Sequence, residues 1–171
     1  MPDYFNPPTP AYPRPHYSPV IDPFFAGMVY DLFNAETTTR SSDAPVGFGV
    51  AVVQDAANFI KVSLPSATNS NFAGVVRHEH IDPGLNGGTP GFPSLYPLPV
   101  LRKGHIVVKL DSNVVAIAPN DPVHVRTTDS GENKKGQFRN TAIAGETIQW
   151  QGANWVRGAS VGCAVVGIDL V

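Results

Sequence analysis

The residue types best suited to chemistry lie in the segment Arg77–Asp82, which reads RHEHID. It holds two histidines, His78 and His80, with Glu79 between them and Asp82 shortly after. Residues two apart on a β-strand share one face, so the two imidazoles could bind one metal ion. However, no third ligand follows at a characteristic spacing, and the HExxH motif of zinc proteases places its histidines four apart on a helix. We interpret the segment as the polar end of a strand and predict no metal ion or other cofactor.

The sequence also offers little for nucleophilic catalysis, which requires an activated Ser, Thr or Cys beside a base. There is no GxSxG motif, and the single cysteine, Cys163, lies in the apolar segment SVGCAVVGIDLV. We therefore expect Cys163 to be a small buried hydrophobic residue rather than a reactive thiol. The glycine-bearing segments 47–49 and 87–91 lack the lysine and the strand–loop–helix context of a phosphate-binding loop. The prediction is that the protein has no catalytic residues.

Basic residues gather in one segment, 129–140, which reads DSGENKKGQFRN and contains Lys134, Lys135 and Arg139. Such a segment could contact nucleic acid. Two acidic residues within it offset part of the charge, and no row of stacking aromatic residues accompanies it. The net charge of the whole chain is −2, which provides no long-range attraction to nucleic acid or to anionic lipid. We interpret the segment as a solvated hairpin tip and predict neither a nucleic-acid nor a membrane partner.

The composition is that of one domain whose surface is unusually poor in charge. The chain has 171 residues, of which 15% are charged and 42% hydrophobic, whereas about 25% charged residues is usual for soluble domains. Low charge suggests that a partner covers part of the surface, although a neutral β domain explains it equally well. No apolar run is long enough to span a membrane. A signal-peptide pattern is also missing and the one cysteine rules out an internal disulfide, so a reducing cytoplasm is the expected compartment.

The chain divides into three parts. Residues 1–23 form a proline- and aromatic-rich segment, the N-terminal arm, which can be neither a helix nor a central strand. Residues 24–44 are expected to form a short helix over 24–35 followed by a polar connector. The helix rests on the spacing of its apolar residues, four, four and three apart. Residues 45–171 form a β body that contains a long irregular loop at 83–103.

Short apolar segments recur every 8 to 15 residues along this body, separated by Gly, Pro, Asn or Asp. This pattern is typical of an all-β fold, either a compact antiparallel β-barrel or a jelly-roll-like sandwich. The C-terminal strand is expected in the core, with Cys163 and Val165 facing inward. The predicted strands cover residues 46–53, 59–64, 72–80, 104–110, 114–118, 123–128, 136–142, 147–150, 154–159 and 162–170.

The N-terminal arm is suited to binding another protein chain. Proline fixes φ in advance, so ordering the arm on a partner costs less conformational entropy than ordering an ordinary segment. In an extended conformation, at about 3.1 Å per residue, it would reach about 70 Å, far enough to contact a neighbouring subunit. Aromatic side chains supply anchoring area and an arginine can pair with a carboxylate. The predicted partner-contacting residues are Tyr4, Phe5, Tyr12, Arg14, Tyr17, Phe24 and Phe25 at the arm, with Phe92 and Tyr96 in the 83–103 loop.

The order and spacing of the strand segments over residues 46–140 resemble the structural cement proteins of tailed bacteriophages. The most telling pieces are Gly104 with its hydrophobic strand, the Asp121–Val123 turn followed by Val125 and Arg126, and the Gly136–Arg139 segment. None of these pieces is a chemical signature. The arm and the 83–103 loop are fuller than is usual for that family.

The resemblance implies a non-catalytic protein that binds the outer surface of a tailed-phage capsid and ties adjacent major capsid proteins together. It implies location on the exterior of the virion and, during assembly, in the host cytoplasm. Its partners would be the major capsid protein and neighbouring copies of itself, as a trimer in preference to a dimer. The alternative is a small β-barrel enzyme or ligand-binding module with a site near His78, His80 and the 83–103 loop, which would need a pocket with convergent polar groups.

Overall fold

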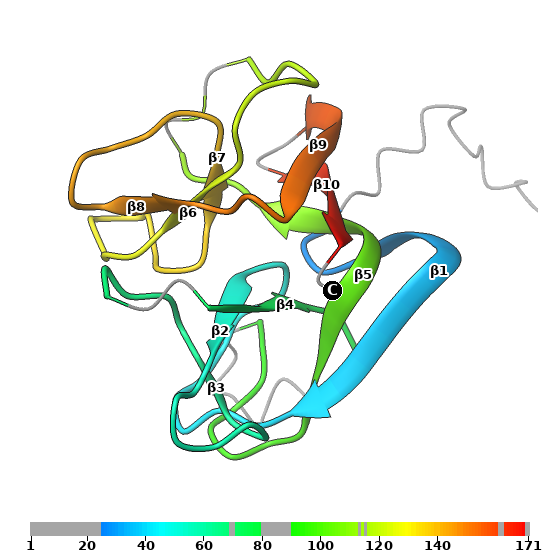
Figure 1. Ribbon diagram of the computed structural model, residues 1–171, viewed down its shortest axis with the longest axis vertical. Coiled ribbons are helices and arrows are strands. Elements are labelled where there is room, and N and C mark those ends of the chain that lie inside the picture. The colour runs from blue at the N-terminus through cyan, green and yellow to red at the C-terminus, as the bar shows by residue number, and fades with distance from the viewer. Residues whose placement is uncertain are drawn as a thin grey trace, which may run out of the picture.

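A computed structural model describes residues 25–68, 71–79, 90–112, 114, 116–160 and 163–169. The described part is built from antiparallel strands, which confirms the all-β prediction (Figure 1). No helix long and apolar enough to cross a membrane occurs in these ranges. The strands are β1 (Val29–Arg40), β2 (Ala51–Gln54), β3 (Val62–Ser63), β4 (Phe72–Val76), β5 (Leu98–Lys109), β6 (His124–Arg126), β7 (Phe138–Arg139), β8 (Thr147–Gln149), β9 (Ala153–Ser160) and β10 (Cys163–Asp169).

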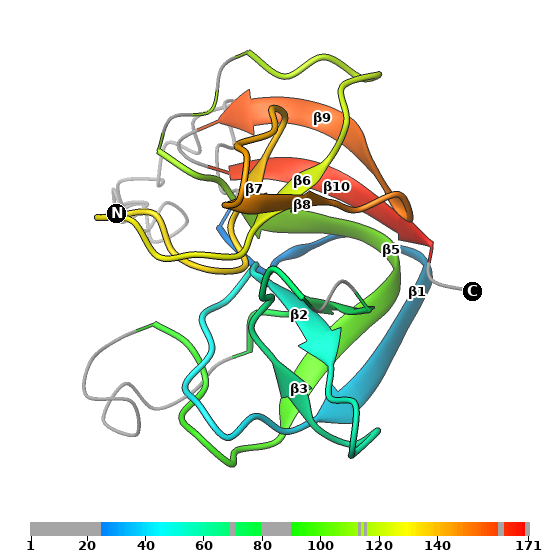
Figure 2. The ribbon, with the colours of Figure 1, turned by 60° about the vertical axis from the view of Figure 1, so that its left-hand side comes forward.

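Strand β5 is the centre of the larger sheet. One of its edges pairs with β1 along almost its whole length, whereas the other edge is shared by two strands. β4 pairs with the first half of that edge, at Val100 and Leu101, and β10 pairs with the second half, from Lys103 onward. The sheet therefore forks at β5, and β4–β2–β3 diverge from β10–β9 (Figures 1 and 2).

Gly104 lies where β5 changes partners. Its φ is +114°, a value that disfavours any residue with a side chain, and a Cβ there would come within 3.2 Å of the Ala35 backbone. A glycine at this point lets β5 bend so that its two halves serve different neighbours while β1 stays close. The glycine singled out by the family resemblance thus has a structural explanation.

A second sheet, in the order β7–β6–β8, packs over the fork, and the two open sheets make a sandwich-like body rather than a closed barrel. The main core lies between them and contains Ile106 and Val166 from the larger sheet with Val125, Phe138 and Trp150 from the smaller one. A second cluster fills the opposite face of β2 and β4. Since both faces of the larger sheet are covered, β10 is buried from Cys163 through Ile168, which confirms its place in the core. The side chains that face the main core are those of Ala164, Val166 and Ile168, whereas Cys163 and Val165, expected to face inward, pack in a smaller cluster with Val107.

The helix predicted over residues 24–35 is wrong, because residues 29–40 form β1. In the pairing with β5, Asp31 lies opposite His105 and Glu36 opposite Lys103, so β1 carries extra residues between these two points. Such an irregularity breaks the alternation of inward and outward side chains. The apolar spacing that predicted a helix therefore arises here in a strand with an irregular register. The following threonines, part of the predicted polar connector, continue β1.

Three further differences concern the ends and the loops. The strand predicted over 114–118 is wrong, since residues 114 and 116–118 are not in a strand. The long loop predicted to end at 103 gives way to β5 already at Leu98, and residues 80–89 lie outside the described ranges. Residues 1–24 also lie outside them, so the structure does not describe the arm.

Candidate functional site: a pocket at the root of the N-terminal arm

The arm joins the body at residues 25–28, and backbone hydrogen bonds fix this root in place. The Gly27 N–H donates to the Val107 carbonyl and the Val107 N–H donates to the Met28 carbonyl, each over 2.8 Å. The Gly27 carbonyl accepts from the His78 N–H, also over 2.8 Å. The root is therefore held between the residues just after β4 and the last part of β5.

Gly49 lets the root approach the segment before β2 closely. Its φ is +69°, and a Cβ at this position would lie 2.7 Å from the Gly27 nitrogen and 2.8 Å from the Ala26 Cβ. Real Cβ atoms do not approach so closely, so a larger residue would push the root away. From the sequence, Gly47 and Gly49 are expected to allow a bend or a close backbone approach, and Gly49 does allow such an approach.

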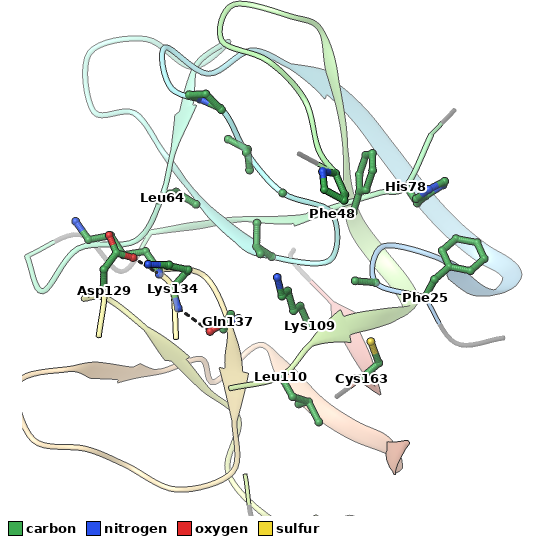
Figure 3. A pocket seen from close by; sticks show the side chains of 17 residues that line it. Phe25, Phe48, Leu64, His78, Lys109, Leu110, Asp129, Lys134, Gln137 and Cys163 are labelled. Atoms are coloured by element: carbon green, nitrogen blue, oxygen red, sulfur yellow. Dashed lines mark hydrogen bonds between the residues drawn. The ribbon is translucent and has the colours of Figure 1, made fainter. Parts of the chain in front are cut away.

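An open pocket of about 760 Å³ lies beside the root, and we call it the Phe25 pocket (Figure 3). One wall carries the rings of Phe25, Phe48 and His78, and the opposite wall carries Asp129 and Lys134 from the smaller sheet's side. Its lining is formed by Phe25, Ala26, Pro45, Val46, Gly47, Phe48, Val50, Leu64, His78, Pro90, Lys109, Leu110, Asp129, Lys134, Lys135, Gln137 and Cys163.

His78 packs against aromatic rings in this pocket. Its ring centroid lies 4.7 Å from that of Phe25 and 4.4 Å from that of Phe48. Among the described residues no group of three or more His, Cys, Asp or Glu could hold a metal ion, and His80 and Asp82 fall outside them. His78 thus has a packing role, and the absence of a metal ion from the segment stays a prediction.

Cys163 lines the floor of the pocket and is buried, as the sequence analysis expected. Burial raises the pKa of its thiol, and the nearby Lys109 opposes this only in part. A thiol with a raised pKa is largely protonated at neutral pH and is a poor nucleophile. The pocket therefore combines an aromatic packing surface, to which His78 belongs, with a buried Cys163 thiol that is a poor nucleophile.

We expect the double variant His78→Ala/His80→Ala to fold and to bind its partners like the native chain. The loss of the edge-type contact with Phe25 and of the tilted contact with Phe48 should lower the free energy of unfolding by about 1 kcal/mol at most. Urea denaturation and metal analysis of the native protein provide the test. Stoichiometric metal that disappears in the variant together with partner binding would contradict the packing role.

The three predicted contact residues that the structure describes have different exposures. Phe25 at the root is 47% exposed and Tyr96 is 40% exposed. Phe92 is fully buried, where it packs beneath Phe48 and Tyr96 with ring centroids 5.4 and 6.1 Å away. The structure thus places Phe92 in the core as a support for two surface rings. The other six, Tyr4, Phe5, Tyr12, Arg14, Tyr17 and Phe24, lie outside the described residues.

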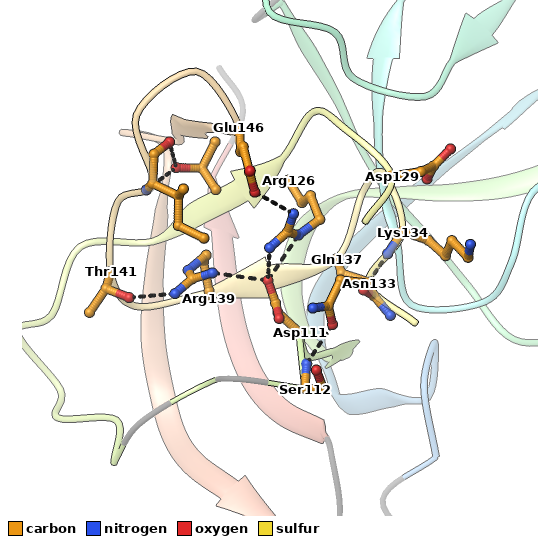
Figure 4. A network of polar contacts seen from close by, with 12 residues as sticks. Asp111, Ser112, Arg126, Asp129, Asn133, Lys134, Gln137, Arg139, Thr141 and Glu146 are labelled. Atoms are coloured by element: carbon orange, nitrogen blue, oxygen red, sulfur yellow. Dashed lines mark hydrogen bonds and ion pairs between the residues drawn. The ribbon is translucent and has the colours of Figure 1, made fainter. Parts of the chain in front are cut away.

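A buried network of ion pairs ties the smaller sheet to the end of β5 (Figure 4). Asp111 accepts from Arg126 at 2.7 and 2.9 Å and from Arg139 at 3.0 Å, and all three side chains are buried. Arg126 also pairs with the half-exposed Glu146 at 2.8 Å. Burial by itself would lower the pKa of Arg126, but the bonds to Asp111 and Glu146 outweigh it and raise the pKa above its usual value.

Arg139 is therefore not part of a solvated basic tip. It belongs to the core network. Burial lowers the pKa of nearby His124, and the positive charge of Arg139 lowers it further. Lys134 remains exposed at the tip, where its backbone N–H donates to Gln137, and the Lys135 N–H donates to Asp129. The nucleic-acid hypothesis loses the one arginine on which it relied.

The Phe25 pocket lies partly where the alternative of an enzyme or ligand-binding module would have its site, because His78 and Pro90 of the 83–103 loop line it. Its lining comes from segments that lie far apart in the chain and meet only because β5 forks. Phe25, His78 and Cys163 draw attention in the sequence for separate reasons, and no local pattern joins them to Phe48 or Lys109 in one pocket.

The described residues form an all-β sandwich with an ion-paired core and an aromatic-lined pocket at the root of the arm. A family model described as "Structural cement protein (E217 gp24/Pam3 gp6)" matches residues 14–169. Because this match spans most of the chain, the protein belongs to the phage structural cement family, whose role is to stabilise the capsid as a component of the virion.

A comparison with solved structures shows a shared fold. A chain from the structure described as "The capsid of Myoviridae Phage XM1" is similar with a TM-score of 0.67 and 18% identity. The likeness covers 85% of this chain and 90% of that one. No curated protein sequence matches the chain.

Proposed function

We propose that the protein binds the outer surface of the capsid and ties adjacent major capsid proteins together through its N-terminal arm. The observation that carries this proposal is the extent of the family match, which begins at residue 14 and so includes part of the arm together with the body. The hydrogen-bonded root supports it, because a force on an arm bound to a neighbour would pass through these bonds to the body.

The proposed division of labour follows from the two parts of the chain. The body rests on the capsid, and the aromatic residues Tyr4, Phe5, Tyr12, Tyr17, Phe24 and Phe25 anchor the arm on a neighbour, with Arg14 available for a carboxylate. Each buried aromatic side chain would contribute about 2 kcal/mol. Many copies on a closed shell then add avidity without further kinds of contact.

The remaining parts of the proposal are the oligomer and the absence of chemistry. We propose a trimer, with assembly from the host cytoplasm and no nucleic-acid or membrane partner. We also propose that the protein is not an enzyme. The family description of a structural protein supports this, as do the protonated state of Cys163 and the ring packing of His78.

A chain that begins at residue 25 tests the role of the arm. It retains the root and the whole of β1, whereas a truncation at residue 36 would remove more than half of that strand. We expect the shortened chain to keep the melting temperature of the isolated protein, because the root's hydrogen bonds remain. Its affinity for capsids that lack the protein should fall by several orders of magnitude, as measured by co-sedimentation over a concentration series.

Two results would contradict this assignment. If the shortened chain binds capsids as tightly as the full chain, the arm is not the tie. If its own melting temperature drops sharply, the arm packs on its own body instead of on a neighbour.

A further inference from the structure

The hairpin between β2 and β3 presents two large apolar side chains to solvent. Phe59 is 76% exposed and Ile60 is 52% exposed. Both residues were predicted to lie in a strand, but the strand begins only at Val62, and neither residue belongs to a core cluster of the body. Single exposed apolar residues are ordinary on protein surfaces, whereas an adjacent aromatic and branched pair at the end of a hairpin is a concentrated apolar tip.

Hydrogen bonds within the hairpin fix this tip. The Asp55 carboxylate accepts from the backbone N–H groups of Ala57 and Asn58 at 2.8 and 2.9 Å. The Asn58 side-chain oxygen accepts from the Ile60 N–H at 3.0 Å, and the Gln54 amide donates to the carbonyls of Asn58 and Lys61 at 3.0 and 2.9 Å. Side chains thus close the loop from both ends, which is a turn chemistry typical of Asp and Asn.

The end of β1 and the residues after it brace the tip from the side. The Arg40 guanidinium donates to the Phe59 carbonyl, and the Ser41 N–H donates to the Ile60 carbonyl at 3.1 Å. Lys61 pairs with Asp43 at 2.7 Å. The backbone that carries the two apolar side chains is therefore held in place, and the neighbouring residues Arg40, Asp43 and Lys61 are charged. An apolar anchor with a polar surround is typical of the centre of a binding surface.

From this geometry we propose that Phe59 and Ile60 insert into an apolar pocket on the major capsid protein. The proposal rests on the proposed function and adds a second contact point to it, separate from the arm. A fixed tip loses little conformational entropy on binding, so most of its apolar burial counts toward affinity.

The size of the tip favours the capsid protein over a second free copy of this chain as the partner. The two side chains offer on the order of 300 Å², well below the roughly 800 Å² per partner that a stable interface buries. The tip is too small to hold a dimer of free chains together. It suits a partner that the arm already holds nearby, because a second contact on the same shell benefits from a high effective concentration.

The double variant Phe59→Ser/Ile60→Ser of the full chain tests the proposal. We expect its urea denaturation curve to match that of the native chain, since both side chains are outside the core. Its affinity for capsids that lack the protein should fall at least tenfold in co-sedimentation. The matched control is Val156→Ser, which removes an exposed apolar side chain, 38% exposed, from β9 and should leave the affinity unchanged.

The outcomes separate this inference from the proposed function. If the native chain does not bind capsids, the proposed function fails. If the native chain binds and the double variant binds equally well, only the tip proposal fails. A photo-crosslinking phenylalanine analogue at position 59 should form an adduct with the major capsid protein, and an adduct with a second copy of this chain would overturn the proposal.

Discussion

Replacement of Asp111 by alanine is expected to lower the free energy of unfolding by about 3–5 kcal/mol. Asp111 is the only carboxylate that contacts both buried arginines, Arg126 and Arg139, in the described part of the chain. Without it, two guanidinium groups remain in the core with Glu146 as the remaining acidic partner of one of them. An uncompensated buried charge costs more than the ion pair itself contributes, which is why loss of one member has so large an effect.

Urea denaturation followed by tryptophan fluorescence measures this effect, because Trp150 and Trp155 are both buried. Asp43→Ala is the control, since its ion pair with Lys61 is exposed and should contribute about 1 kcal/mol or less. Adding Arg139→Met to the Asp111→Ala variant should recover part of the loss, because it removes one of the unpaired charges. An Asp111→Ala protein as stable as the native chain would show that the network does not hold the two sheets together.

Replacement of Val166 by aspartate is expected to prevent folding. Val166 is fully buried in the main core, opposite Ile106 on β5 and Trp155 on β9. An unpaired carboxylate there costs several kcal/mol, which is comparable with the whole stability of about 5–15 kcal/mol of a typical domain. The variant should be insoluble or should show no cooperative thermal transition by circular dichroism.

Two neighbouring substitutions serve as matched comparisons. Val165→Asp lies on the opposite face of β10, in the smaller cluster with Val107, and Arg157 is its partner on β9. It should destabilise the protein less than Val166→Asp does. Val156→Asp at an exposed position of β9 should be tolerated. A Val166→Asp protein that melts cooperatively would show that β10 is placed wrongly.

The all-β class and most strand positions could be predicted because short apolar segments between turn residues carry a local signal. β10 is the clearest case, since the strand observed at Cys163–Asp169 lies within the predicted range 162–170. The prediction for the residues of β1 was wrong for a physical reason. Its extra residues opposite β5 remove the alternation that identifies a strand, and this irregularity is fixed by a partner far along the chain. Local spacing carries no information about that partner.

The site was less predictable than the fold because its residues meet through long-range contacts. Asp111 and Arg126 looked unrelated in sequence, and Arg139 looked like part of a basic tip until its pairing was visible. Phe59 and Ile60 carried the composition of a strand, but the preceding Asp55 and Asn58 close a turn through their side chains. The family resemblance, which depends on the order of segments, was unaffected by these errors, and the family match confirms it.

The most direct test of the proposed function is binding of the full chain to closed, genome-filled particles that lack it. Only the outer surface of such particles is accessible. We expect saturable co-sedimentation, together with a higher temperature of genome release once the chain is bound. Failure to bind closed particles, or binding that leaves the release temperature unchanged, would contradict a role as exterior capsid cement.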